Sequence, residues 1–204
     1  MPIPNRAATR PLRRPPRDFD QFKLPRTRQP ARKWFRVHQS KFPAIFWSVN
    51  TAHRFSHARC SYPLLYLAMD IDTCLFERFG DKTYEDEKAV AQSIWNLHSV
   101  SEIQVPELHL CDLTNAKTLS AARVDLTALM HHELAIPQEW GLAIQRHPAS
   151  FQGIKFKSRF NAKSCLALFQ REGVEKRLQE NSLDSLRKND LAVDWLHKHK
   201  VSLY

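Results

Sequence analysis

The sequence PLLYLAMDIDTCLFERFG, at residues 63–80, predicts a buried strand that runs directly into a helix. Its run LLYLA has the length of a strand and is apolar except for Tyr66. Asp70 or Asp72 is suited to cap the helix that follows, because a short carboxylate accepts hydrogen bonds from the free N–H groups of the first turn. Glu77 lies farther along, among apolar residues. A phenol and a carboxylate kept in apolar surroundings suggest a pocket, but these two residues alone do not establish one.

The length and composition of the chain indicate a single domain. The chain has 204 residues, of which 43% are hydrophobic, and this is enough for one hydrophobic core. No apolar run reaches the roughly 18–20 residues of a membrane-spanning helix, and the basic N-terminus lacks the apolar region of a secretory signal. The four cysteines are far apart and form no CxxC pair. Sparse cysteines are typical of a reduced protein rather than a disulfide scaffold, so we expect a cytoplasmic location.

Residues 1–33 differ in composition from the rest of the chain. They carry ten Lys or Arg and two Asp, a net charge of +8 out of +10 for the whole chain, and seven of the twelve prolines. Proline removes a backbone donor and fixes φ, so we predict an extended, mostly disordered basic arm before a folded domain at residues 34–204. The arm is either a solvated tail, a contact for a polyanion, or an organelle-targeting peptide, and its prolines disfavour the last.

The remainder of the chain mixes short strands irregularly with helices. Strands are expected at 34–38, 64–69, 103–105, 108–111, 153–160 and 165–169, and further helices at 85–97, 138–147 and 190–199. The first of these helices is inferred from the apolar spacing of Val90, Ile94 and Leu97. Trp95 falls beside that apolar stripe. The irregular order predicts an α+β fold rather than a doubly wound parallel sheet.

Several catalytic motifs are absent from the sequence. It contains no GxGxxG, GxxxxGK[ST], HExxH or GxSxG pattern. His131, His132 and Glu133 are three potential metal ligands in succession. Because consecutive side chains point in different directions on a helix or a strand, we predict no metal site there.

Five polar residues lie in apolar surroundings. They are Arg36, Arg54, Tyr66, Glu77 and Ser158. Each has a purely structural alternative. The two arginines could extend over surface aromatics, and the hydroxyl of Tyr66 could bond to backbone within the core. Glu77 could face solvent, and Ser158 could lie on the polar side of an alternating strand.

These residues and their surroundings resemble the RES-domain toxins of bacterial toxin–antitoxin pairs, a family named for an arginine, a glutamate and a serine. Four blocks carry the resemblance: WFRVHQSKF (34–42), HRFSHARCSYPLLYLAMDIDTCLFERFG (53–80), LCDLTNAKTL (110–119) and EWGLAIQRHPASFQGIKFKSRFNAKSCLALFQR (139–171). The resemblance extends over residues 34–204. It implies an ADP-ribosyltransferase-like α+β fold that destroys NAD⁺.

The resemblance places an NAD⁺ pocket on the five polar residues. Guanidinium groups bind phosphate oxygens in a bidentate fork, which suits Arg36 and Arg54 for the pyrophosphate. The ring of Tyr66 would face the nicotinamide ribose or the nicotinamide. Glu77 would stabilise the positive charge that develops on the ribose as the nicotinamide–ribose bond breaks. Ser158 would position the ribose or the incoming nucleophile.

The resemblance also implies the reaction and the partner. The enzyme would be an NAD⁺ phosphorylase or an NAD⁺ glycohydrolase, with inorganic phosphate or water as acceptor and with NAD⁺ as substrate rather than cofactor. A cognate antitoxin, typically an Xre-like DNA-binding protein, would occupy the cleft. Two alternatives stay open: a protein ADP-ribosyltransferase, and a nucleic-acid-binding module that acts through the basic arm. The net charge of only +2 on residues 34–204 and the absence of an evident recognition helix count against the second.

Overall fold

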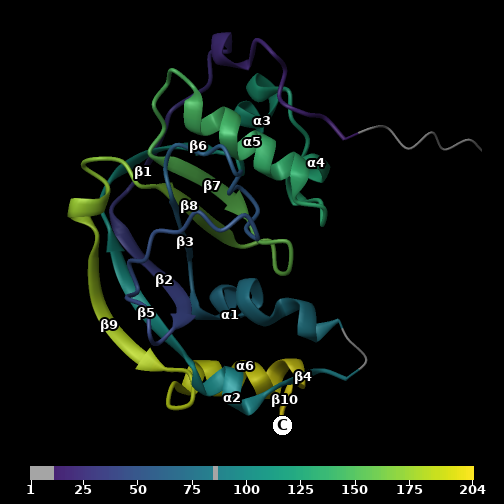
Figure 1. The fold of residues 1–204 in the computed structure, drawn as a ribbon, viewed down its shortest axis with the longest axis vertical. Coiled ribbons are helices and arrows are strands. Elements are labelled where there is room, and N and C mark those ends of the chain that lie inside the picture. Colours follow the sequence, from purple (N-terminus) through teal and green to yellow (C-terminus); the bar gives the residue numbers. More distant parts are fainter. Residues whose placement is uncertain (1–11, 85–86) are drawn as a thin grey trace, which may run out of the picture.

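The computed structural model describes residues 12–84 and 87–204 and is built around a strongly curled sheet of eight strands (Figure 1). The strand order is β1-β6-β7-β8-β3-β2-β5-β9. These strands are β1 (Thr27–Gln29), β2 (Arg32–Gln39), β3 (Leu64–Ala68), β5 (His98–Val105), β6 (Leu108–Asp112), β7 (Gly153–Lys157), β8 (Ser164–Phe169) and β9 (Gln179–Ser185). Neighbours are antiparallel except β6 and β7, which are parallel. A small parallel sheet joins β4 (Ala89–Val90) to β10 (Ser202–Leu203).

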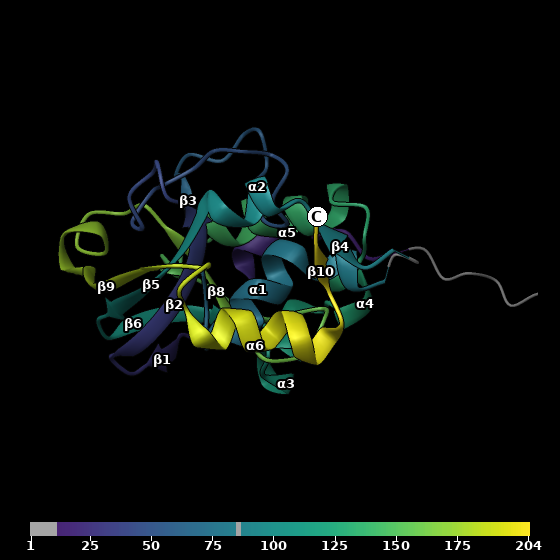
Figure 2. The same ribbon diagram turned by 90° about the horizontal axis from the view of Figure 1, so that it is seen from below.

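The helices lie on the concave side of the curled sheet and at its two ends (Figures 1 and 2). They are α1 (Ile71–Phe79), α2 (Gln92–Asn96), α3 (Ala116–Ala122), α4 (Leu126–Met130), α5 (Ala135–Arg146) and α6 (Asp190–His199), with 3₁₀ turns at Phe19–Gln21, Gly80–Thr83 and Glu175–Arg177. α3, α4 and α5 gather at one end, α2 and α6 lie at the other, and α1 is between the two groups. This mixture confirms the predicted α+β fold. Within the described ranges, the structure contains no helix with the length and apolar character needed to cross a membrane.

The curled sheet opens between β2 and β3. These strands are joined through one residue pair, Phe35 with Ala68, whereas β2 pairs with β5 along all eight of its residues. On its other edge β3 pairs with β8 over five residues. Because β2 and β3 diverge, side chains from both strands reach the space between them. α1 follows β3 directly and lines the same space.

The apolar run LLYLA is explained by burial on both faces of β3. Leu64 packs in the core cluster around Trp140, with Tyr66 against the edge of that cluster. Leu65 packs in a second cluster, around Trp34. Since successive side chains of a strand point to opposite faces, a strand covered on both faces needs apolar residues in succession. Tyr66 therefore lies on the Leu64 face.

The N-terminal cap of α1 is formed as predicted, by the first of the two candidate carboxylates. Asp70 accepts a hydrogen bond of 2.8 Å from the backbone N–H of Thr73. The predicted closing helix is also confirmed, as α6. The strands expected on either side of Pro106 are present as β5 and β6.

The helix predicted at 85–97 is wrong. The chain forms the two-residue strand β4 and the short α2 instead, and the first two residues of the predicted helix lie outside the described residues. Ile94 is 46% exposed and Leu97 is 60% exposed, whereas Trp95 is 1% exposed. Trp95 packs on Phe79 with ring centroids 5.4 Å apart. The large aromatic side chain therefore sets the buried face of α2, rather than the apolar stripe beside it.

The prediction of a disordered arm does not hold for the described residues 12–33, and residues 1–11 lie outside the description. Phe19 is 3% exposed and meets the ring of Trp140 edge-on at 5.3 Å. The indole N–H of Trp140 donates to the carbonyl of Arg13 at 2.8 Å. β1 pairs with β6, and β2 begins inside the expected arm, so the boundary expected before the domain is wrong. Proline excludes a long helix or a central strand, but it permits an edge strand and a packed extended segment.

Candidate active site

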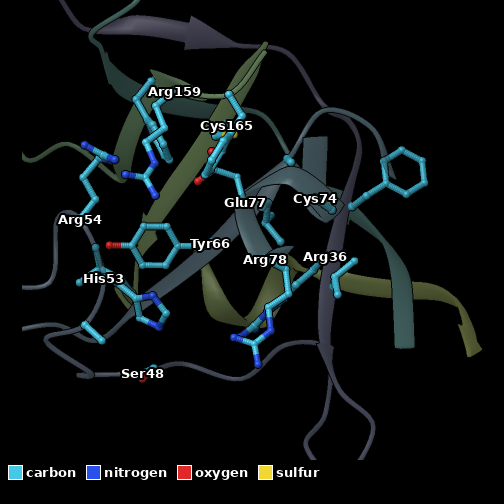
Figure 3. Close-up of a pocket in the computed structure, with 18 of the residues that line it drawn as sticks. Arg36, Ser48, His53, Arg54, Tyr66, Cys74, Glu77, Arg78, Arg159 and Cys165 are labelled. Carbon is cyan, nitrogen blue, oxygen red and sulfur yellow. The ribbon is translucent and has the colours of Figure 1, made fainter. Parts of the chain in front are cut away.

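A cavity of about 400 Å³ opens where β2 and β3 diverge, and α1 forms one of its walls (Figure 3). Its polar and charged lining residues are Arg36, Ser48, His53, Arg54, Tyr66, Glu77, Arg78, Asp81, His132 and Arg159. The volume is within the range of small-molecule sites, which is roughly 300–1,000 Å³. Four arginines against two carboxylates make the lining cationic, so it favours an anionic ligand.

Glu77 projects into this cavity from the last turn of α1. Its side chain is open to the cavity, and its Oε1 accepts a hydrogen bond of 2.6 Å from the hydroxyl of Ser158. The concave surroundings exclude enough water to raise the pKa of the Glu77 carboxyl, and the hydrogen bond and the charge of Arg54 oppose that rise. A carboxylate fixed in this way is suited to stabilise a positive charge that develops close to it.

Ser158 lies in the turn after β7 and is 0% exposed. Its hydroxyl donates to Glu77 and also accepts the backbone N–H of Phe160 at 3.3 Å. The sequence led us to expect contact with a ribose or a nucleophile. The structure instead encloses this hydroxyl in protein and directs it at the carboxylate, so the geometry supports a positioning function for Ser158.

Tyr66 presents its ring to the cavity while its hydroxyl bonds to the protein. The hydroxyl oxygen accepts the backbone N–H of Phe55 at 3.0 Å and lies 3.2 Å from the hydroxyl of Ser56. Burial raises the pKa of the phenol, so it is neutral at physiological pH. The ring of His53 packs against that of Tyr66 with centroids 5.1 Å apart. Tyr66 thus holds the segment that carries Arg54 and offers a ring face to a ligand, which favours positioning over acid–base chemistry.

Arg36 joins β2 to the loop that follows it. Its Nη1 donates to the carbonyls of Ala44 at 2.6 Å and Phe46 at 3.0 Å. Burial lowers the pKa of Arg36 to about 10, so the group is still a cation at neutral pH. A guanidinium has five N–H donors, and these contacts use one of its nitrogens. Arg36 is therefore not an arginine that extends over surface aromatic residues, which was the structural alternative.

Arg54 is fixed in a similar way on the opposite wall. Its Nη1 donates to the carbonyls of Leu129 at 2.9 Å and His131 at 3.1 Å, in and after α4. The segment that carries Arg54 also rests closely on α5. A Cβ at Gly141 would overlap the carbonyl oxygen of Phe55, so this approach requires glycine.

The five predicted site residues are therefore brought together, four on the cavity wall and Ser158 behind Glu77. Sequence reasoning assigned no place in the pocket to the six other polar residues of the wall, which are Ser48, His53, Arg78, Asp81, His132 and Arg159. Arg159 pairs with Asp81 at 2.5 Å and covers the ring of Phe160 at 4.6 Å. The signal available for Arg78 and Arg159 was their position directly after Glu77 and Ser158.

The cationic residues form two groups on either side of Tyr66 and Glu77 (Figure 3). The charges of Arg54 and Arg159 act on the Glu77 carboxyl and oppose the rise of its pKa that burial causes. Burial and the charges of Arg36 and Arg78 lower the pKa of His53 at the other side. The cavity thus offers positive charge at two places, separated by an aromatic face and a carboxylate.

The sequence HHE at residues 131–133 lies on the connection between α4 and α5. The rings of His131 and His132 pack against each other in a tilted arrangement with centroids 4.3 Å apart, and His132 lines the cavity. In the part of the chain that the structure describes, no group of three or more His, Cys, Asp or Glu residues is arranged to hold a metal ion.

Comparisons with known proteins agree with this architecture. The model of the RES domain family matches residues 23–195. A chain of the crystal structure of the M. tuberculosis MbcT–MbcA toxin–antitoxin complex has a similar fold, with a TM-score of 0.60 and 17% sequence identity. The similarity covers 84% of this chain and 90% of that one. No curated protein matches the sequence. The family match begins inside the segment that composition had assigned to an arm.

Proposed function

The chain belongs to the RES domain family, and we propose that it is the toxin of a toxin–antitoxin pair, which degrades NAD⁺ by cleaving the nicotinamide–ribose bond. The observation that carries this proposal is the Glu77 carboxylate, held at 2.6 Å by Ser158 inside a cationic cavity. The similar fold of the MbcT–MbcA chain, which comes from a toxin–antitoxin complex, supports the toxin assignment.

The charges of the cavity suit a dinucleotide. NAD⁺ carries two negative charges on its pyrophosphate, and arginine is the side chain best suited to bind phosphate oxygens through paired N–H groups. Arg36 and Arg54 supply such groups from opposite walls. The ring of Tyr66 lies between them and provides a flat apolar face for the nicotinamide or its ribose.

Glu77 supplies the catalytic electrostatics. When the bond between the nicotinamide nitrogen and the ribose breaks, the electron pair leaves with nicotinamide and positive charge develops on the sugar. A carboxylate close to that carbon lowers the free energy of the charged transition state. Water or inorganic phosphate then bonds to the same carbon. Water gives ADP-ribose and a proton, and phosphate gives ADP-ribose phosphorylated at the anomeric carbon.

The proposal includes a cognate antitoxin, an Xre-like DNA-binding protein that covers the cavity in the cytoplasm. An exposed apolar surface beside the cavity supports it. Phe42 and Phe46 stack at 4.8 Å and are 39% and 38% exposed. They belong to the loop that leads to Ser48 on the cavity wall. A protein seated on this aromatic pair would close the adjacent opening.

Incubation of the purified protein with NAD⁺, with and without inorganic phosphate, tests the reaction. Nicotinamide with free ADP-ribose identifies a glycohydrolase, and phosphorylated ADP-ribose formed only with phosphate identifies a phosphorylase. ADP-ribose attached to a protein would identify an ADP-ribosyltransferase instead of a glycohydrolase or a phosphorylase. Intact NAD⁺ together with salt-sensitive DNA binding would overturn the proposal in favour of nucleic-acid binding.

A further inference from the structure

Arg78 and His98 form a pair that the proposed chemistry does not use. Arg78 follows Glu77 on α1 and lines the cavity on the side of Arg36 (Figure 3). Its Nε donates a hydrogen bond of 3.0 Å to Nε2 of His98. His98 is the first residue of β5 and is 1% exposed, and its Nδ1 lies 2.7 Å from the carbonyl oxygen of Ile94. A buried histidine thus connects the cavity wall to α2.

These contacts fix the protonation state of His98. A carbonyl oxygen can only accept, so Nδ1 of His98 carries a proton and donates it to Ile94. The guanidinium N–H of Arg78 can only donate, so Nε2 of His98 must have a free lone pair. The imidazole is therefore neutral and in a single tautomer.

The same contact fixes the direction of the Arg78 guanidinium. Because the group is planar, holding Nε defines the plane in which the two terminal NH₂ groups lie. Phe79 adds a second constraint. The Arg78 guanidinium lies over the Phe79 ring, 5.8 Å from its centroid, and the His98 ring meets the Phe79 ring edge-on with centroids 5.5 Å apart. Among the described residues, the side-chain hydrogen bond of Arg78 is made by Nε, so its terminal donors are available to a ligand in the cavity.

The surroundings of His98 oppose its protonation. Burial and the charges of Arg78 and His38 lower the pKa of His98, and the Ile94 carbonyl opposes that shift. Arg78 and His38 are the charged or titratable groups, among the described residues, whose charge acts on His98. A proton on Nε2 would remove the lone pair and place a second cation 3.0 Å from Arg78.

We propose that Arg78 is a further anion-binding residue of the cavity, that neutral His98 is its positioning residue, and that protonation of His98 releases Arg78 and weakens substrate binding. The inference rests on the proposed function, since the anion would be the pyrophosphate of NAD⁺. Above pH 6.5, the ordinary pKa of histidine, His98 is neutral and its contact with Arg78 is intact, and the affinity falls as the pH drops through the lower pKa of His98.

The first experiment measures kinetics with NAD⁺ and calorimetric binding of inorganic pyrophosphate for Arg78→Gln. A charged hydrogen bond contributes about 1.5–3 kcal/mol, so KM and the pyrophosphate Kd should rise about 10- to 100-fold, with a much smaller change in kcat. Arg146→Gln is the matched control, because Arg146 is an exposed arginine on α5 that bonds to the carbonyl of Arg59 and does not line the cavity. It should change neither quantity.

The second experiment separates His98 from a purely structural residue. His98→Gln retains an acceptor that does not titrate, so KM should stay near that of the unmodified protein and the rise of KM at acid pH should disappear. His98→Met removes the acceptor at similar size, and its KM should match that of Arg78→Gln. His38→Gln removes the neighbouring histidine and should retain the acid rise. Nitrogen-15 NMR of the full chain should show His98 with its proton on Nδ1.

The outcomes separate this inference from the proposed function. Unchanged NAD⁺ and pyrophosphate binding in Arg78→Gln, or an acid rise that persists in His98→Gln, would overturn the inference and leave the proposed function intact. An unmodified protein that leaves NAD⁺ intact would overturn the proposed function. In that case weaker pyrophosphate binding by Arg78→Gln would still support the anion site, and unchanged binding would overturn it.

Discussion

The hydroxyl of Ser158 holds the carboxylate of Glu77 at 2.6 Å across a separation of 81 positions in the chain. The two residues come from a turn of the sheet and from the last turn of α1. Since Ser158 is fully enclosed, its hydroxyl has little access to water or ligand. The orientation of Glu77 in the cavity therefore depends on how closely α1 approaches the turn after β7.

Ser158→Ala is expected to reduce kcat and to shift the pH dependence of activity. The hydrogen bond lowers the pKa of Glu77, so its removal raises that pKa further and moves the acid side of the kcat profile to higher pH. A hydrogen bond to a charged group contributes about 1.5–3 kcal/mol, which corresponds to a loss of about 10- to 100-fold. Ser61→Ala, at an exposed serine, is the control. An acid limb in the same place as that of the unmodified protein would contradict this account.

Glu77→Gln is expected to lower kcat by about 10²–10³-fold, as loss of one well-placed electrostatic partner does. The two side chains have nearly the same shape, and the amide oxygen can still accept from Ser158. Binding of NAD⁺ should change much less, because the arginines remain. Consumption of NAD⁺ at saturating substrate measures the loss. A variant with an unchanged rate would show that Glu77 is structural.

The same substitution should not lower thermal stability at pH 7. The folded pKa of Glu77 is raised, so the folded chain holds a proton more tightly than the unfolded chain. Stability therefore falls as the pH rises from the ordinary carboxyl pKa through the raised value, and the ionised form is unfavourable to folding at pH 7. Gln carries no charge and avoids this cost. The melting temperature at pH 7 should be equal or higher, and the difference should shrink at pH 4.

The composition of the site could be predicted from sequence, but the connections within it could not. Arg36, Tyr66 and Glu77 were found because polar residues in apolar runs are unusual and because their blocks resemble a family. The hydrogen bond by which Ser158 orients Glu77 depends on a contact between α1 and the turn after β7, which are distant in the sequence. Arg78 looked like an ordinary helix residue, since its importance depends on His98, twenty positions farther along.

Arg36→Lys is expected to raise KM for NAD⁺ more than it lowers kcat. Lysine keeps the charge but has no planar fork, so it cannot bond to Ala44 and Phe46 and also bind phosphate with paired donors. The loop that follows β2 should exchange its amide hydrogens faster, which hydrogen–deuterium exchange mass spectrometry can measure. Arg32→Lys is the matched control, on the same strand, at an exposed arginine over the ring of Trp34. Equal kinetics for both variants would remove Arg36 from the binding site.

The predictable part of the fold was the part with clear local signals, although the apolar spacing at 85–97 was misleading. β3 was found because a short apolar run favours a buried strand, and α6 because Lys and His in its last turns are typical of the C-terminal end of a helix. β9 was missed because its sequence, QENSLDS, is mainly polar. It is an edge strand that pairs with β5 on one side. Backbone pairing to a sheet already formed can recruit such a segment without an apolar pattern, and the sequence contains little sign of that pairing.

Phe19→Ala tests whether the N-terminal segment is part of the domain. Phe19 is 3% exposed and contacts the rings of Trp140 and His147 at 5.3 and 5.4 Å. Truncating a buried phenylalanine typically costs about 3–5 kcal/mol, because the transfer free energy of the removed atoms is lost and a void is left in the core. Urea unfolding at pH 7 should show a loss of this size. Phe46→Ala, at a 38% exposed phenylalanine, should cost far less.

NAD⁺ turnover by Phe19→Ala, measured well below its melting temperature, should stay close to that of the unmodified protein, because Phe19 does not line the cavity. A disordered arm gives the opposite expectation for stability. Its residues would bury little surface. The substitution would then change the free energy of unfolding by less than about 0.5 kcal/mol, as is usual at exposed sites. An unfolding midpoint that does not move would therefore return residues 12–33 to a solvated tail, and a large shift with retained turnover would make them structural residues of the catalytic domain.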